Sequence, residues 1–214
     1  MNTILVLALS LNIPMVPAVD SSWEMIEEIE AIKVYQKDMA GSDVVAFMGE
    51  AVVDAELSKV LFVLSDAEHE GDWVDSLGKN LVLEQSTPFD RIQYQNFELP
   101  WPVSDRDFVY AASVRWDPQN SHVILRMNSV EHGKAPKTSS VRADIMESTF
   151  LLWPLADNKT HVRVSIFSDP KGWIPTWLVN LMQRSWPQET LQGIRRQVKK
   201  AFIRPGPVPP KRVD

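Results

Sequence analysis

Midway along, the chain reads Pro100-Trp101-Pro102-Val103-Ser104-Asp105-Arg106-Asp107-Phe108-Val109, an apolar turn followed by the start of a strand. The two prolines stiffen a turn that presents Trp101 and Val103, whereas connecting loops normally expose polar residues. From Phe108 to Trp116 the residues alternate with period two, which predicts a strand with one inward face. Nearer the C-terminus, Asp169-Pro170-Lys171-Gly172-Trp173-Ile174-Pro175 leads into apolar residues at helical spacing.

Most of the remaining chain is strand-like. We expect helices at 23–31 and 55–67, a short helix or loop at 69–77, and a long final helix that begins at Pro175, is kinked at Pro187 and reaches Phe202. Strands are expected at 32–38, 44–53, 81–86, 91–99, 108–116, 122–130, 141–153 and 160–167. Short links between consecutive strands favour an antiparallel sheet, so the fold class is α+β. A curved sheet around one helix leaves either a filled core or a ligand cavity.

Composition narrows the class of protein. The 214 residues suffice for one domain, and 44% hydrophobic with 23% charged residues is typical of a folded globular chain. A net charge of −6 argues against nucleic acid as the main partner. With no cysteine, disulfides and thiolate chemistry are excluded. The four histidines are scattered, and we find no hydrolase elbow, phosphate loop or metal-ligand spacing, so no catalytic residue and no metal site is predicted.

Both ends differ from the middle. Residues 1–18 contain the apolar run Ile4–Leu11 and small residues before Val19, which predicts a cleaved signal peptide and export to a periplasm or the exterior. The usual basic residues before such a run are missing, so an ordinary apolar extension of a cytoplasmic protein is the alternative. At the other end, residues 205–214 are rich in proline and predict an extended, mobile tail.

Three motifs carry a family resemblance. The turn with Arg106-Asp107-Phe108-Val109, then Val141-Arg142-Ala143, then Lys171-Gly172-Trp173-Ile174-Pro175 resemble the START (StAR-related lipid transfer) family over about residues 21–203, within an expected domain of residues 19–204. The signal-like leader is similar to bacterial members. The resemblance implies a helix-grip fold with a tunnel for a single lipid, roofed by the terminal helix and the loop 99–105. It implies no cofactor.

Strand parity selects the residues expected to line the tunnel. They are Phe108, Tyr110, Ala112, Val114, Leu125, Met127, Ile145, Glu147 and Thr149 from the sheet, with Leu178 and Met182 from the terminal helix. Tyr110, Glu147 and Thr149 are the polar members that would orient a head group. Sterol-binding relatives often carry an arginine near the position of Ala112, and its absence here argues against a sterol.

Trp101, Val103 and Trp173 are expected at the tunnel mouth, where indole suits a water–lipid boundary and a transient membrane contact. The alternative is that both tryptophans pack under the lid. The predicted function is reversible binding, with possible transfer or sensing, of one lipid or similar apolar molecule by a monomer. Two alternatives remain open: a cavity enzyme of the cyclase or aromatase type, for example with Glu147 and His161, and an interaction domain with a filled core.

Overall fold

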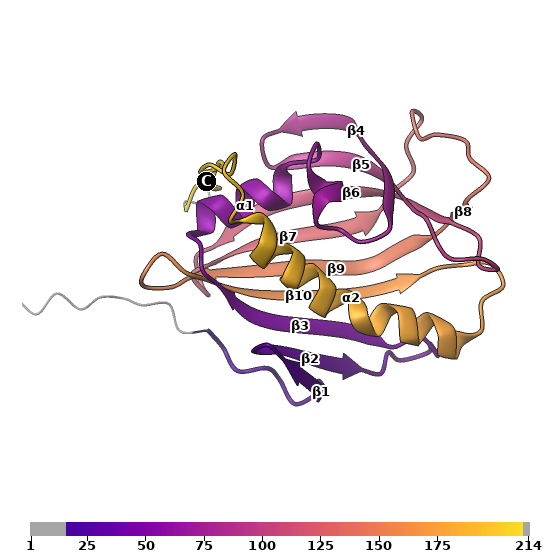
Figure 1. Cartoon of the computed structure of the whole chain (residues 1–214), viewed down its shortest axis with the longest axis horizontal. Coiled ribbons are helices and arrows are strands. Elements are labelled where there is room, and N and C mark those ends of the chain that lie inside the picture. Colours follow the sequence, from indigo (N-terminus) through magenta and orange to yellow (C-terminus); the bar gives the residue numbers. More distant parts are fainter. Residues whose placement is uncertain (1–15, 212–214) are drawn as a thin grey trace, which may run out of the picture.

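A strongly curved antiparallel sheet wraps around one long helix (Figure 1). The computed structural model describes residues 16–211, so the Ile4–Leu11 run of the expected leader and the last residues of the tail lie outside the described range. The strands are β1 (Glu24–Ile29), β2 (Ile32–Lys37), β3 (Ala46–Val53), β4 (Leu77–Thr87), β5 (Asp90–Phe97), β6 (Arg106–Asp117), β7 (His122–Ser129), β8 (Val141–Arg142), β9 (Asp144–Pro154) and β10 (Thr160–Asp169). The helices are α1 (Leu57–Ser65), the short 3₁₀ turn η1 (Glu70–Asp72) and α2 (Thr176–Gln197).

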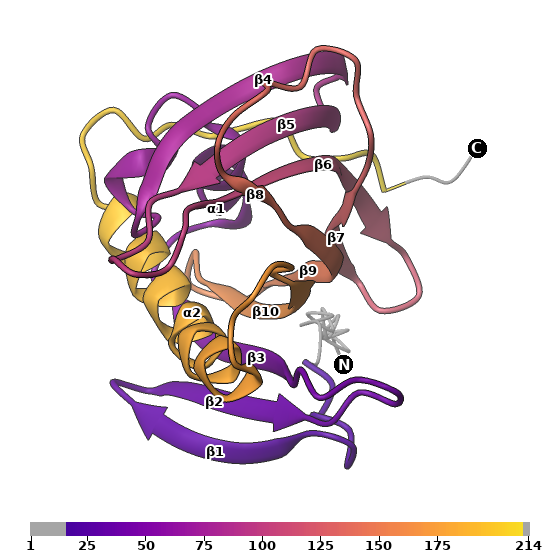
Figure 2. The ribbon, with the colours of Figure 1, turned by 90° about the vertical axis from the view of Figure 1, so that its right-hand side faces the viewer.

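The strands follow one another in the order β1-β2-β3-β10-β9-β7-β6-β5-β4, and the short β8 pairs in parallel with β6. Every other pairing along this path is antiparallel, as the short links predict. The expected α+β class and helix-grip arrangement are confirmed. Figure 2 shows α2 across the open side of the curved sheet, between the β1–β3 end and the β4–β5 end.

Helix α2 packs closely on β3 at Gly49. A Cβ atom at this position would lie 2.8 Å from the Cβ of Pro187 and 3.0 Å from the Cδ1 of Leu191, so only glycine lets the helix approach this near. Leu191 and Ile194 have no exposed surface and anchor the helix in the core. The C-terminal half of α2 therefore packs directly against the inner face of the sheet, while the N-terminal half leaves space between the helix and the sheet.

The helix predicted at 23–31 is wrong. These residues form β1, which turns into β2 through Glu30 and Ala31, both with positive φ (53° and 55°), as a two-residue hairpin turn requires. In the sequence, Ser21 and Ser22 followed by Glu24, Glu27 and Glu28 are typical of a helix start. Pairing of β1 with β2 extends the sheet and prevails over that local signal.

Helix α2 differs from its expected span at both ends. Pro175 precedes the helix in an extended conformation, and the helix continues through Pro187 and ends at Gln197. Phe202, expected on the same apolar stripe, lies beyond the end and stacks on the ring of His69, with ring centroids 4.3 Å apart.

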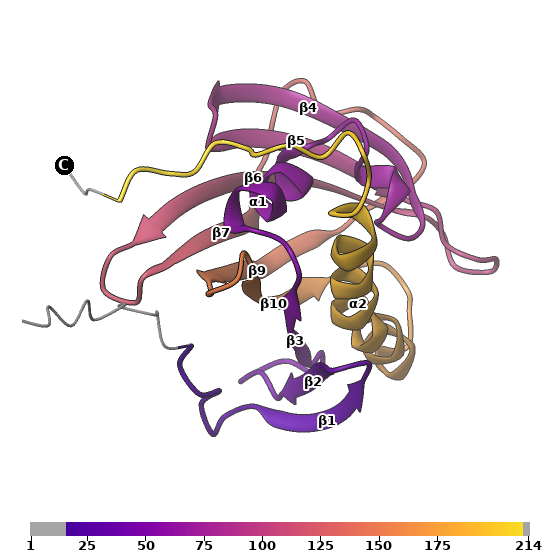
Figure 3. The ribbon, with the colours of Figure 1, turned by 60° about the vertical axis from the view of Figure 1, so that its left-hand side comes forward.

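The proline-rich tail is extended but packs against the domain instead of standing free. The Gly206 amide donates to the Ser58 carbonyl at 2.8 Å, and Pro209 is buried. Arg204 lies over the ring of Phe62. Figure 3 shows the tail running past α1. These contacts contradict the expectation of a mobile end for the described part of the tail, and proline's restricted φ explains how a segment without regular structure is held there.

Candidate functional site: an apolar pocket under the terminal helix

A pocket of about 440 Å³ lies between the N-terminal half of α2 and the inner face of the sheet. Its walls come from β5, β6, β7, β9 and β10, from the loop 99–103 and from the segment that leads into α2. Most of its lining is apolar. Among the residues predicted from sequence, those that line it are Val103, Phe108, Tyr110, Met127, Ile145, Leu178 and Met182. We call this space the main pocket.

Two smaller spaces continue along the inner face. One of about 60 Å³ shares Tyr110 and Met127 with the main pocket and is also lined by Ala112 and Leu125. The next, of about 250 Å³, again includes Ala112 and Leu125 and adds Val114. The predicted residues of β6 and β7 therefore line this series of three neighbouring spaces.

Large exposed apolar side chains lie next in sequence to residues that line the main pocket. Trp101 is 92% exposed and Trp173 94% exposed, so the alternative in which both pack under the lid is wrong. Two further exposed side chains, Trp177 and Leu181, project from the first turns of α2. Exposed apolar residues that gather in this way mark a contact surface. We call these four residues the mouth patch.

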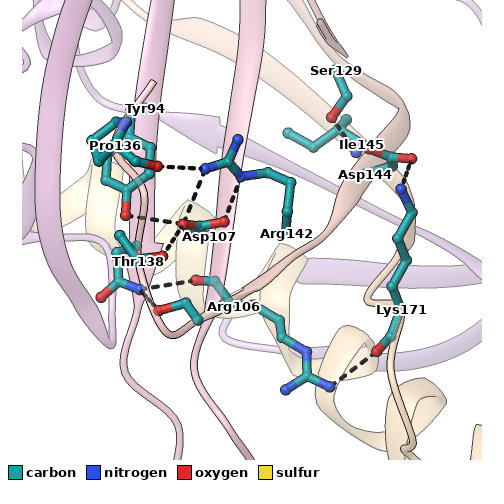
Figure 4. Close-up of polar contacts among 12 residues, drawn as sticks. Tyr94, Arg106, Asp107, Ser129, Pro136, Thr138, Arg142, Asp144, Ile145 and Lys171 are labelled. Atoms are coloured by element: carbon teal, nitrogen blue, oxygen red, sulfur yellow. Dashed lines mark hydrogen bonds and ion pairs between the residues drawn. The ribbon is translucent and has the colours of Figure 1, made fainter. Parts of the chain in front are cut away.

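Buried polar contacts fix the loops around the mouth (Figure 4). The Arg106 guanidinium donates to the carbonyls of Pro170 at 2.9 Å and of Lys171 at 3.0 Å, which ties β6 to the segment before α2. Next to it, the fully buried Asp107 accepts hydrogen bonds from Arg142 and from Thr138. Burial raises the pKa of Asp107, but the bonds from Arg142 and Thr138 outweigh that effect and hold the pKa below its ordinary value.

Comparison with known protein families matches residues 13–200 to the START domain. The chain belongs to the START domain family. This confirms the family that the three sequence motifs indicated. No helix in the described part of this START domain is long and apolar enough to cross a membrane.

Several relatives of this START domain are named for lipid transfer. It is 25% identical over 164 residues to the bovine phosphatidylcholine transfer protein, covering 75% of this chain and 76% of that protein. It is 27% identical over 189 residues to the Xenopus laevis ceramide transfer protein, covering 79% of this chain but only 31% of that protein. The solved STAR-related lipid transfer protein of Xanthomonas axonopodis is 28% identical, with a TM-score of 0.75, covering 84% of this chain and 99% of that structure.

Two predicted pocket residues of the START domain, Glu147 and Thr149, lie on the outer face of the sheet instead. A bulge in β9 causes this, because Glu147 pairs with Phe167 while Ile145 pairs with the adjacent Ser168. The extra residue in β9 reverses the alternation, since a slip of one residue moves side chains to the opposite face. Both residues line a separate outer pocket of about 370 Å³.

His161 also lies away from the main pocket, in an ion cluster centred on Glu50. Its Nε2 is 3.3 Å from a Glu50 oxygen, which also accepts from Arg163 at 2.8 Å, while Tyr35 donates to the other oxygen at 2.8 Å. Burial raises the pKa of Glu50, but the bonds from His161, Arg163 and Tyr35 outweigh burial and bring the pKa to about 2. The hypothesis of an acid–base pair of Glu147 and His161 inside the cavity is therefore wrong.

The Glu50 cluster is expected to make the stability of the domain depend on pH in the acid range. Because the folded pKa of about 2 lies below the ordinary 4.5, the ionised carboxylate stabilises the domain above about pH 4.5, and this contribution is lost as the pH falls towards about 2. We expect wild type to exceed Glu50→Gln in unfolding free energy by on the order of 3 kcal/mol at neutral pH. Urea unfolding at a series of pH values should show the difference shrinking through that window. A constant difference would contradict the prediction.

Sequence reasoning missed two polar residues of the main pocket. Gln95 in β5 and Gln183 in α2 both line it and are at least nine-tenths buried. Gln95 belongs to the face of β5 that carries Arg91 and Gln93, a polar pattern typical of a solvent-facing strand surface. Only the curvature of the sheet places this face inside, so the period-two pattern gave no signal for it.

Proposed function

We propose that this domain reversibly binds one lipid or similar apolar molecule in the main pocket. The observation that carries the proposal is the apolar pocket itself, which has the volume of a small-molecule site and lies in a START domain whose named relatives transfer lipids. Apolar surface leaving water contributes about 25 cal/mol per Å², so a buried acyl chain supplies ample affinity. The pocket volume weighs against a filled-core interaction domain.

We further propose that the mouth patch touches a membrane while the ligand enters or leaves. Trp101 and Trp173 are nearly fully exposed beside Val103 and Ile174, which line the pocket. Indole rings favour the boundary between water and lipid, so these side chains would rest there with the pocket opening towards the acyl chains. Binding and exchange need no reacting group, and the position of Glu147 and His161 on the outer face supports a carrier over a cavity enzyme.

Filling the main pocket tests the proposal. Ile145 lines the pocket, and its neighbour Met146 is 52% exposed on the bulge of β9. We expect Ile145→Trp to lower the affinity for a fluorescent acyl probe at least tenfold while the melting temperature stays near that of wild type, because the ring enters empty space. Met146→Trp is the matched control and should bind normally. Unchanged binding by Ile145→Trp, or strong destabilisation from overpacking, would refute a ligand in this pocket.

A further inference from the structure

The space of about 250 Å³ at the far end of the inner face, which we call the rear pocket, is enclosed by α1, by the turn between β4 and β5 and by β6. Its apolar lining residues include Leu61, Leu64, Phe89, Val114 and Leu125. Along β6, Val114 lies six residues beyond Phe108 of the main pocket, which is about 20 Å at the rise of a strand. The rear pocket and the main pocket therefore lie at different ends of the same strand face.

The space of about 60 Å³ lies between these two pockets. It shares Tyr110 and Met127 with the main pocket, and it shares Ala112 and Leu125 with the rear pocket. Ala112 has the smallest side chain among the residues that line this middle space. An extended apolar chain that entered the main pocket and passed Ala112 would reach the rear pocket.

The charged side chains at the rear pocket already have partners within the protein. The Arg91 guanidinium donates to the Ser65 carbonyl at 2.6 Å and to the Leu64 carbonyl at 3.1 Å, at the end of α1. A carboxylate oxygen of Asp90 lies 2.5 Å from the guanidinium of Arg115. Because the rest of the lining is mostly apolar, this pocket suits the methyl end of an acyl chain better than a head group.

The C-terminal tail forms part of the wall of the rear pocket, where Pro207 lines it. Gly206 seats the tail on α1, which Figure 3 shows it crossing. A Cβ atom at Gly206 would lie 2.9 Å from the backbone nitrogen of Phe62 and 3.0 Å from its Cα, so a larger residue could not approach α1 this closely. Further along, Lys211 Nζ lies 4.8 Å from the centre of the Trp116 ring. Contacts on both sides therefore hold Pro207 at the pocket.

This tail follows residue 200, where the match to the START domain ends. We propose that the tail forms the rear wall of the ligand space and gives the domain a preference for long acyl chains. With the tail in place, the end of a long chain is buried in the rear pocket, and without the tail the same methylenes meet water. Each methylene that leaves water changes affinity about fourfold, so two change it more than tenfold. The inference rests on the proposed function, because it concerns the same ligand.

The test compares two lipids that differ only in chain length. Delipidated full-length protein is offered an equimolar mixture of lauroyl- and stearoyl-lysophosphatidylcholine, and native mass spectrometry gives the ratio of the two complexes. A chain that stops after Arg204 lacks the tail, and we expect its stearoyl-to-lauroyl ratio to fall at least about tenfold below wild type. Gly206→Val keeps the whole tail but prevents its close contact with α1, and it should lower the ratio in the same way. Gly133→Val is the matched control and should leave the ratio unchanged, because a Cβ atom at Gly133 would meet nothing within 4 Å.

Filling the rear pocket tests the same inference with the tail undisturbed. Val114 lines the rear pocket but not the main pocket. We expect Val114→Phe to weaken stearoyl binding at least about tenfold and to leave lauroyl binding near that of wild type, because the ring takes the space of the chain end. The two full-length variants, Gly206→Val and Val114→Phe, decide the question even if removal of the tail prevents folding. An unchanged ratio in either of them would overturn the inference.

The outcomes separate the two proposals. If neither lipid binds wild type, lipid binding in the main pocket is itself refuted. If both lipids bind and the tail variants keep the wild-type ratio, the tail does not select chain length, while lipid binding stands. An equal loss of both lipids in the tail variants would show that the tail supports the fold and not the chain end, and it would also overturn the inference.

Discussion

Replacing Asp107 with alanine is expected to lower the free energy of unfolding by about 3 kcal/mol, the lower end of the range for breaking a buried ion pair from one side, because the partner Arg142 is 41% exposed. Asp107 has no exposed surface, and one of its oxygens lies 2.5 Å from Arg142 Nε. The other accepts from Thr138 at 2.7 Å and from the Tyr94 hydroxyl at 3.1 Å. Alanine would leave these donors without their acceptor. Urea unfolding monitored by tryptophan fluorescence measures the loss.

A surface ion pair provides the control. Arg115 contacts Asp90 at 2.5 Å, but its side chain is 58% exposed, so Arg115→Ala should cost less than about 1 kcal/mol. A cost for Asp107→Ala as small as that for Arg115→Ala would mean that the cluster in Figure 4 contributes little to stability.

The position of Asp107 also links stability to the site. Asp107 directly follows Arg106 in β6. Arg142, the partner of Asp107, also donates to the Pro136 carbonyl and so joins the strand to that segment, whereas Arg106 joins the strand to the carbonyls before α2. Parallel pairing of β8 with β6 places Arg142 directly beside Asp107. The sequence motifs that indicated the family therefore contain the residues whose contacts fix the loops at the mouth of the pocket.

Strand alternation predicted the inner face of β6 and β7 correctly because these strands pair without a break from Tyr110 to Asp117. It failed for β9, where the bulge next to Met146 shifts the register and places Glu147 outside. A bulge is set by how two strands meet, and a single strand's sequence carries no mark of it. The same limit applies to β1. Its residues satisfy the rules for a helix start in sequence, but in the structure they pair with β2.

The polar part of the site was hidden for a different reason. A glutamine on a strand predicts solvent, and only the closure of the sheet around α2 places Gln95 and Gln183 against the same pocket. The exposure of Trp101 and Trp173 could be predicted, because both residues lie beside prolines or glycine in segments too short to bury an indole. Local chemistry was therefore readable from sequence, and the chemistry created by tertiary closure was not.

Replacing both Trp101 and Trp173 with alanine is expected to slow lipid exchange with vesicles by more than tenfold while the melting temperature changes little. The rings are 92% and 94% exposed, so they contribute little to folding. If both enter the membrane interface, each contributes about 1.5 to 3 kcal/mol of apolar transfer, so together they raise membrane affinity by at least about a hundredfold. Fluorescent lipid transfer between vesicles, with cosedimentation for membrane binding, measures the effect.

Trp23→Ala, on the outer face of the sheet, is the matched tryptophan control and should exchange lipid at the wild-type rate. If the double variant exchanged lipid normally, the mouth patch would not be the membrane contact, and if it unfolded several degrees earlier, the rings would belong to the core.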